Sequence, residues 1–192
     1  LCLGAGEAAT DISDLLVNAM TEEGVEAADA RARCWMVDSK GLVVASRGEL
    51  AEHKRPYAHA HAPVSDFIGA VKSLRPTAII GVGAVPGTFT EEVVREMSRI
   101  NERPVIFALS NPTSKAECTA QQAYEWSDGR ALFASGSPFD AVTLPDGRHF
   151  VPRQGNNSYI FPGLGLALVV VGATRVTDTM FLAAARTLAR CT

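Results

Sequence analysis

The chain has 192 residues, 47% of them hydrophobic, which is enough to bury a sizeable core in one large domain. Its 18 lysines and arginines are balanced by 21 aspartates and glutamates without any basic run, so we expect no nucleic-acid partner. The longest apolar runs, residues 163–173 and 181–189, are shorter than the ~20 residues of a membrane span, so we expect no membrane partner.

Strand-like and helix-like segments alternate along the chain. Only residues 1–3 precede the turn at Gly4, where a strand of ~5 to 6 residues is usual, so we expect a fragment of a longer protein. The remaining predicted elements, in chain order, are a helix at residues 7–23, a strand at 34–37, an extended piece at 42–44, a loop at 47–63, a helix at 64–74, a strand at 78–82, a helix at 90–99, a strand at 105–109, a helix at 114–126, a strand at 131–134, a loop, and helices at 159–172 and 178–190.

This alternation, at intervals of roughly 25 residues, predicts an α/β fold of the Rossmann type, with a doubly wound, mostly parallel sheet and helices on both faces. We expect one domain over residues 1–192, in which residues 159–192 form a helical C-terminal part. Two helix starts carry the spacing of a capping box, namely Thr88 with Glu91 and Ser114 with Glu117.

The first turn has the spacing of a dinucleotide fingerprint, Gly4-x-Gly6-x-x-Ala9, between a strand and a helix. Gly4 permits the tight turn, Gly6 lets the backbone approach a pyrophosphate, and Ala9 allows close packing of the helix on the strand. Asp38 ends the next strand and can accept hydrogen bonds from an adenosine ribose. A structural glycine turn and an ordinary Asp-Ser-Lys-Gly turn would give the same patterns, so both interpretations stay open.

Cationic and amide side chains are further candidates. A 2′-phosphate could be bound by Ser39, Lys40, Lys54 and Arg55, although such residues also occur in solvated loops. Asn111 follows the strand at residues 105–109, where its amide can donate to a carboxylate or a carboxamide. Asn111 could instead cap its own turn, and Asn156 and Asn157 have the same two interpretations.

Metal and nucleophile chemistry has little support in the sequence. His59 and His61 could share one face of a strand, but no carboxylate or thiol at ligand spacing accompanies them, so we expect solvated loop histidines. No Ser-His-Asp set is evident. The widely spaced Cys2, Cys34, Cys118 and Cys191 include no C-x-x-C pair, which argues against a zinc ribbon or a disulfide framework and favours a reducing compartment.

Five motifs, which together extend over almost the whole chain, carry a resemblance to a known family. They are LGAGEAA at residues 3–9, VDSKG at 37–41, FALSNPTSKAEC at 107–118, FASGSPF at 133–139 and QGNNSYIFPG at 154–163. In this order and at these spacings, they resemble the carboxy-terminal cofactor domain of malic enzyme.

The resemblance implies a role for each candidate residue. The pyrophosphate would lie on Gly4, Ala5, Gly6, Glu7 and Ala8. Asp38 would bind the adenosine ribose, and Val82 and Gly83 would lie along the cofactor. The nicotinamide side and the carboxylates of malate would be contacted by Asn111, Asn156 and Asn157. Because Ser39, Lys40 and Lys54 match positions that look NADP-like in this family, NADP is expected in preference to NAD.

The activity that the resemblance implies is oxidative decarboxylation of malate to pyruvate and carbon dioxide, with reduction of NADP or NAD. A divalent Mg or Mn ion would assist in the intact enzyme. In this family the metal ligands and the catalytic Tyr and Lys precede the glycine turn, and this chain starts after them. We therefore assign no catalytic residue or metal ligand to the chain, and we expect it to be inactive as an isolated fragment.

The resemblance also implies a homo-oligomer, dimeric or tetrameric, in the cytoplasm or the mitochondrial matrix. Two other kinds of protein stay open. One is a non-catalytic dinucleotide-binding sensor or regulatory module, which would keep the fold without the chemistry. The other is an interaction domain in which the glycine turn is purely structural.

Overall fold

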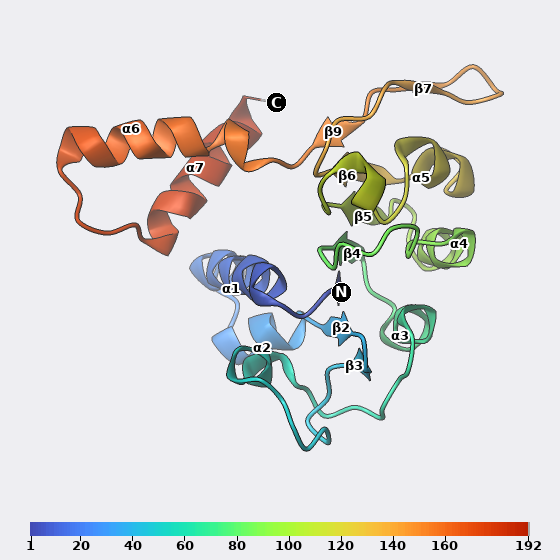
Figure 1. Ribbon diagram of the computed structural model, residues 1–192, viewed down its shortest axis with the longest axis horizontal. Coiled ribbons are helices and arrows are strands. Elements are labelled where there is room, and N and C mark those ends of the chain that lie inside the picture. Colours follow the sequence, from blue (N-terminus) through green and yellow to red (C-terminus); the bar gives the residue numbers. More distant parts are fainter. Residues whose placement is uncertain (192) are drawn as a thin grey trace.

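Seven short strands build the central sheet of the computed structural model, which describes residues 1–191 (Figure 1). Their order is β3-β2-β1-β4-β5-β6-β9, and all neighbouring pairs are parallel except β2 and β3. The strands are β1 (Cys2–Leu3), β2 (Met36–Asp38), β3 (Gly41–Leu42), β4 (Ala78–Gly81), β5 (Val105–Ala108), β6 (Leu132–Ser135) and β9 (Arg153–Gln154), and a separate hairpin is formed by β7 (Val142–Thr143) and β8 (His149–Phe150).

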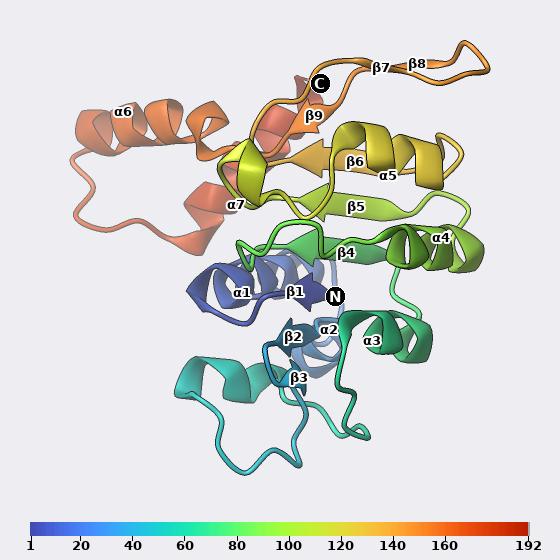
Figure 2. The ribbon, with the colours of Figure 1, turned by 45° about the vertical axis from the view of Figure 1, so that its right-hand side comes forward.

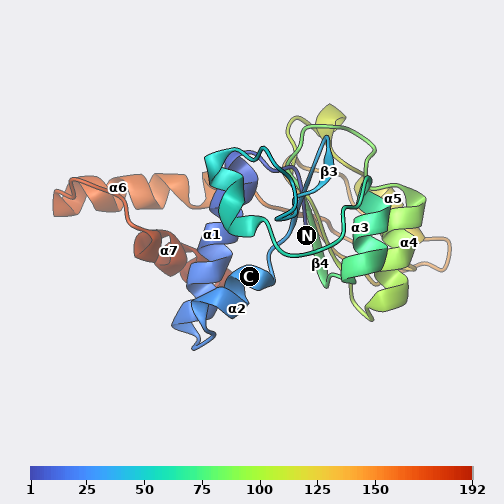
Figure 3. The same cartoon turned by 90° about the horizontal axis from the view of Figure 1, so that it is seen from below.

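Helices cover both faces of this sheet (Figure 3). One face carries α1 (Glu7–Glu22) and α2 (Ala27–Ala32), and the other carries α3 (Phe67–Leu74), α4 (Glu91–Ile100) and α5 (Ala120–Trp126). Strands β4, β5 and β6 run side by side in the same direction (Figure 2). The predicted Rossmann-type fold, a doubly wound and mostly parallel sheet, is therefore confirmed.

The sheet separates two apolar cores, because neighbouring strand residues point to opposite faces. Ile79 is fully buried against Val94 and Met97 in the core beneath α3, α4 and α5. The next residue, Ile80, belongs to the other core with Ala9 and other residues of α1. Each fully buried aliphatic side chain stabilises the fold by about 1.5–3 kcal/mol, so these two layers hold the strand ends in place.

Both predicted capping boxes are wrong. Helix α4 is capped by Thr90, whose hydroxyl oxygen accepts from the amide of Val93, whereas Thr88 donates to the carbonyl of Val85. Helix α5 starts only at Ala120, after a capping box of Thr119 and Gln122 that has the same sequence spacing. The predicted start at residue 114 fails because residues 113–115 form a separate 3-10 turn, η2 (Thr113–Lys115).

Several short elements escape the sequence prediction. Helix α2 was not expected, and the predicted loop at residues 47–63 contains a 3-10 helix, η1 (Glu52–Tyr57). Strand β6 was expected to be the last strand, but β9 pairs parallel with it and extends the sheet. Helix α2 and η1 are too short to show a helical period, and β9 lacks the apolar run that marks β4, β5 and β6, which explains why the sequence pattern missed them.

The two predicted C-terminal helices are present. They follow a 3-10 turn, η3 (Asn157–Tyr159), and are α6 (Phe161–Val171) and α7 (Asp178–Arg190). Helix α7 packs against α1, where Asn18 donates to Asp178 over 2.7 Å. Helix α6 projects away from the sheet, with exposed Val169 and Val170 (Figure 1). None of the helices formed by residues 1–191 combines the length and the apolar character needed to cross a bilayer. Thr192, the last residue of the predicted C-terminal part, lies outside the described residues.

Candidate functional site

A cavity of about 640 Å³ opens at the carboxyl ends of β1, β2 and β4. Strands β2 and β3 lie on one side of β1, whereas β4 and β5 lie on the other, so this is the switch point where open α/β sheets bind ligands. Of the predicted cofactor residues, those that line the cavity are Gly4, Ala5, Gly6, Asp38, Ser39, Lys54, Val82 and Gly83.

The two glycines of the first turn serve different purposes. Gly4 has φ +121°, and an added Cβ would lie 3.1 Å from the carbonyl carbon of Val82, so the fold itself requires a glycine there. Gly6 has an ordinary extended conformation, and nothing lies within 4 Å of the place that its Cβ would occupy. The fold does not require a glycine at position 6, but a ligand approaching the backbone would.

The N-terminus of α1 lacks a side-chain cap. Helices α3, α4 and α5 are capped by Asp66, Thr90 and Thr119, whereas the residue that precedes α1 is Gly6, which has no side chain to accept from the first-turn amides. Those amides face the cavity end of the helix and suit an anion such as a phosphate. Glu7 and Ala8 are exposed in this first turn without lining the cavity, so their contribution would come from backbone N–H groups.

Asp38 lies between two cations. Its carboxylate accepts from both terminal nitrogens of Arg47 at 3.1 Å, from Lys54 at 2.8 Å and from the backbone N–H of Lys40 at 2.9 Å. Burial by itself would raise the pKa of Asp38, but the hydrogen bonds from Arg47, Lys54 and Lys40 outweigh it and lower the pKa to about 2. Two cationic side chains thus face one carboxylate at this end of the cavity.

We expect the substitution Asp38→Asn to destabilise the chain in a pH-dependent way. The folded-state pKa of Asp38 is depressed, so its stabilising effect is complete above the unfolded-state pKa of about 4 and is lost as the pH falls through about 2. Urea unfolding of both proteins between about pH 7 and 2.5 should show a difference in unfolding free energy that shrinks below about pH 4. A difference that is constant over this range would contradict the prediction. Asp146→Asn, at an exposed pair with Arg148, is the matched control.

Two residues that contact the cavity lining, Arg47 and His53, were not expected from the sequence. Arg47 lies in the predicted loop, where no period marks a contact, and it reaches Asp38 only through the fold. The Nε2 atom of His53 is 3.1 Å from the carbonyl oxygen of Ala5, so η1 reaches across to the glycine turn. The buried Tyr57 donates its hydroxyl to Asp14 and ties η1 to α1. Arg55, another candidate, does not line the main cavity.

His59 and His61, which were expected to be solvated loop residues, are partly exposed and partly packed on Trp35. The ring of His59 lies 4.6 Å from that of Trp35, and its Nε2 atom is 2.8 Å from the carbonyl oxygen of Cys34. The ring of His61 packs edge-on against the same Trp35, with 5.6 Å between centroids, and its Nε2 atom is 3.0 Å from the hydroxyl of Ser73. Both imidazoles therefore pack against one indole ring.

A second polar group forms beside the ends of β5 and β6. Ser137 donates its hydroxyl to Oδ1 of Asn111 over 2.7 Å, and Asn156 donates its amide to the carbonyl of Gly136 over 3.2 Å. Residues 136 and 137 thus connect Asn111 and Asn156, two of the three predicted asparagines, although neither asparagine lines the main cavity. Oδ1 of Asn156 also accepts from the amide of Ser158, so this side chain does cap its own turn.

The remaining candidates are exposed. The side chains of Lys40 and Asn157 face solvent beyond the cavity lining. Among residues 1–191, no three histidine, cysteine, aspartate or glutamate side chains gather in a way that could hold a metal ion. The four cysteines are free thiols, and burial raises the pKa of Cys118 to about 12, so that its thiol stays protonated at neutral pH.

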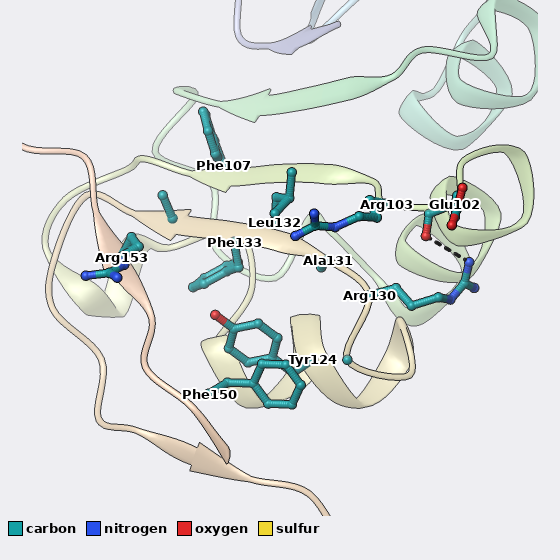
Figure 4. A pocket seen from close by; sticks show the side chains of 12 residues that line it. Glu102, Arg103, Phe107, Tyr124, Arg130, Ala131, Leu132, Phe133, Phe150 and Arg153 are labelled. Atoms are coloured by element: carbon teal, nitrogen blue, oxygen red, sulfur yellow. Dashed lines mark hydrogen bonds between the residues drawn. The ribbon is translucent and has the colours of Figure 1, made fainter. Parts of the chain in front are cut away.

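Another cavity, of about 580 Å³, lies beside β6 and the hairpin (Figure 4). The rings of Tyr124 and Phe150 stack there at 4.5 Å, and Arg130 donates to the carbonyl of Glu102. Its lining includes Leu132, at the amino end of β6, rather than residues beyond the carboxyl ends of the strands. Its glycine, Gly129, follows the end of α5 and does not lead from a strand into a helix N-terminus, so the cavity does not suit a dinucleotide.

Comparison with known proteins agrees with the geometry of the main cavity. Residues 1–192 match the family model described as malic enzyme, NAD-binding domain. The chain is 52% identical over 187 residues to the NADP-dependent malic enzyme of Mus musculus, and 56% identical over 191 residues to NADP-dependent malic enzyme 2 of Arabidopsis thaliana. These alignments cover 97% and 98% of the chain but 33% and 32% of the relatives, so the chain spans about a third of the length of the curated relatives that it matches.

Proposed function

This chain belongs to the malic enzyme family and corresponds to the NAD-binding domain of that family, and from this premise we propose that it binds the dinucleotide of an NADP-dependent malic enzyme. We propose further that it prefers NADP to NAD. The adenosine half would lie beside Asp38, and the pyrophosphate would lie on the amides that follow Gly6. The relatives named above support the choice of NADP, since both carry NADP dependence in their names.

The observation that carries the proposal is the pair of cations on Asp38. An unpaired carboxylate at the end of β2 would repel a 2′-phosphate, but here Arg47 and Lys54 outnumber the single negative charge. The exposed side chains of Ser39 and Lys40 adjoin this group and add a hydroxyl donor and a further cation. Charge-assisted hydrogen bonds to a phosphate are the strong ones, so this end of the cavity favours NADP.

We further propose that the reaction is oxidative decarboxylation of malate to pyruvate and carbon dioxide, with a hydride passing to the nicotinamide. Neutral amides can orient the two carboxylates of malate without cancelling the charge that leaves as carbon dioxide, and Asn111, Asn156 and Asn157 are the candidates. A Mg or Mn site is usually built on carboxylates, and among residues 1–191 no three carboxylate, imidazole or thiol side chains gather in a way that could hold a metal ion. The proposal therefore assigns no metal ligand or proton-transfer residue to residues 1–191.

Thermal denaturation in the presence of NADP or NAD tests the proposal. At equal concentrations, NADP should raise the melting temperature more than NAD does, because the more tightly bound ligand stabilises the folded state more. No shift with either dinucleotide would favour an interaction domain with a structural glycine turn. Malate-dependent reduction of NADP by a protein that carries this chain would separate an enzyme from a non-catalytic dinucleotide sensor.

A further inference from the structure

Glu117 is a fully buried carboxylate at the junction of two loops. It lies beyond the end of β5, between η2 and α5, and within residues 1–191 it forms no ion pair. Burying a carboxylate is unfavourable unless hydrogen bonds compensate. Its hydrogen-bond partners therefore indicate what this residue does.

The partners of Glu117 lead to the loop that follows β4. Ser110 donates its hydroxyl to Oε1 of Glu117, and its backbone N–H lies 3.4 Å from Oε2. The hydroxyl oxygen of Ser110 in turn accepts from the backbone N–H of Ala84 over 2.9 Å. Because Ser110 donates its hydroxyl proton to the carboxylate, the lone pairs of its hydroxyl oxygen are directed towards the backbone N–H of Ala84. That residue has φ +54°, a conformation that a non-glycine residue adopts only where its surroundings impose it.

Backbone contacts join the same two segments. The amide of Phe89 donates to the carbonyl of Glu117 over 3.0 Å, and the amide of Gly87 donates to the carbonyl of Ala116 over 3.3 Å. At Gly81, the last residue of β4, an added Cβ would overlap the carboxyl group of Glu117. The strand end thus has a glycine where the carboxylate packs, and residues 82–89 are fixed to residues 110–117.

Residues 82–89 contribute the β4 side of the cavity wall, and residues 110–117, none of which lines the cavity, hold them in place. Val82, Gly83 and Val85 line the cavity from the β4 side, and Asn111 directly follows Ser110. A dinucleotide bound at the switch point has its adenosine half on the β2 side, so its nicotinamide half lies on the β4 and β5 side. We propose that Glu117 is a positioning residue for the nicotinamide half, acting through Ser110, an inference that rests on the proposed function.

Two ligands separate the halves of the site when bound by the 192-residue chain. NADPH contains both halves and reports binding through its nicotinamide fluorescence, whereas adenosine 2′,5′-bisphosphate contains only the adenosine half. In Glu117→Gln, the new side-chain N–H₂ group can face the hydroxyl and backbone N–H of Ser110, which are themselves donors. Ser110→Ala removes the hydroxyl that accepts from the backbone N–H of Ala84. Each should weaken NADPH binding about tenfold while changing the affinity for adenosine 2′,5′-bisphosphate less than about twofold.

The double variant tests whether Glu117 acts through Ser110. If it does, combining Glu117→Gln with Ser110→Ala should weaken NADPH binding no more than the stronger single change, because both break one chain of hydrogen bonds. If the double variant instead loses affinity for NADPH by the product of the two single losses, the proposal is overturned. Ser110→Ala by itself carries the test if Glu117→Gln does not fold, since the hydroxyl of Ser110 is the link.

Ser127→Ala is the matched control, because Ser127 is, like Ser110, a buried serine whose hydroxyl both donates and accepts a hydrogen bond, here between backbone groups of α5 and the start of β6. It should leave the affinities for both ligands unchanged. If the Glu117 and Ser110 variants lose affinity equally for both ligands, the role of these residues is purely structural and the inference is overturned. Unchanged affinity for NADPH in these variants would overturn it as well. If the unaltered chain binds neither ligand, the proposed function fails, and the inference fails with it.

Discussion

Replacing Gly6 with valine should weaken NADP binding by at least ~100-fold, which corresponds to about 2.7 kcal/mol, while the free energy of unfolding changes by less than about 1 kcal/mol. Nothing lies within 4 Å of the added Cβ, and the backbone at Gly6 is in the extended region that β-branched residues adopt easily. The new side chain would instead occupy the space in front of the first turn of α1, where a pyrophosphate has to approach.

Isothermal titration with NADP, together with urea unfolding, checks this expectation. Gly163→Val is the matched control, because an added Cβ at Gly163 also meets nothing within 4 Å but lies in α6, outside the cavity. Gly4→Val should behave in the opposite way and unfold the chain more easily, because Gly4 has φ +121°. Binding of NADP by the Gly6→Val variant with an affinity within threefold of the unaltered chain would contradict the assignment of the pyrophosphate site.

Replacing Lys54 with glutamine should weaken NADP binding by roughly 10- to 100-fold and leave NAD binding nearly unchanged. The side chain of Lys54 is held at 2.8 Å from Asp38, where it lines the cavity. Its loss removes one of two cations and leaves the carboxylate of Asp38 paired with Arg47 alone, so less positive charge faces the 2′-phosphate. NAD has no phosphate at this position and does not depend on that charge.

The selectivity should therefore change more than the overall affinity. Titrations with NADP and NAD give the ratio of the two affinities for each protein. When they are repeated at a higher salt concentration, the NADP affinity of the unaltered chain should fall more steeply than that of the Lys54→Gln variant. Lys72→Gln removes a lysine from an exposed pair with Glu92 on α3 and α4 and serves as the control. An equal loss of NADP and NAD affinity would show that Lys54 supports the cavity in general rather than the 2′-phosphate.

The sequence predicts best those elements that are long enough to show a period. Helix α1 and helix α7 were expected within a residue or two of their observed bounds, because each places apolar residues at helical spacing over several turns. The strands β4, β5 and β6 were also expected, since each is a buried apolar run between turn residues. Helix α2 and strand β9 carry too few residues for such a signal.

The candidate site was predictable only where a local motif marks it. Gly4, Gly6 and Asp38 stand at fixed distances from strand ends, so their position at the cavity could be expected. Arg47 could not be expected, because its contact with Asp38 depends on how a loop without a period folds back. Glu117 was assigned to a capping box, since two competing patterns of equal spacing lie five residues apart and only packing decides between them.

The central sheet ends at both sides in a strand of two residues, β3 at one edge and β9 at the other. Each edge offers very few free N–H and C=O groups with which a strand of another molecule could pair. Strand β9 pairs only with the end of β6, so the first residues of β6, from Leu132, remain unpaired on this side. Arg130 and Arg153 line the same cavity as Leu132, and charged side chains at an open edge oppose pairing with another strand. Within residues 1–191 the folded chain thus presents no long open edge strand, which protects it against stacking into cross-β aggregates.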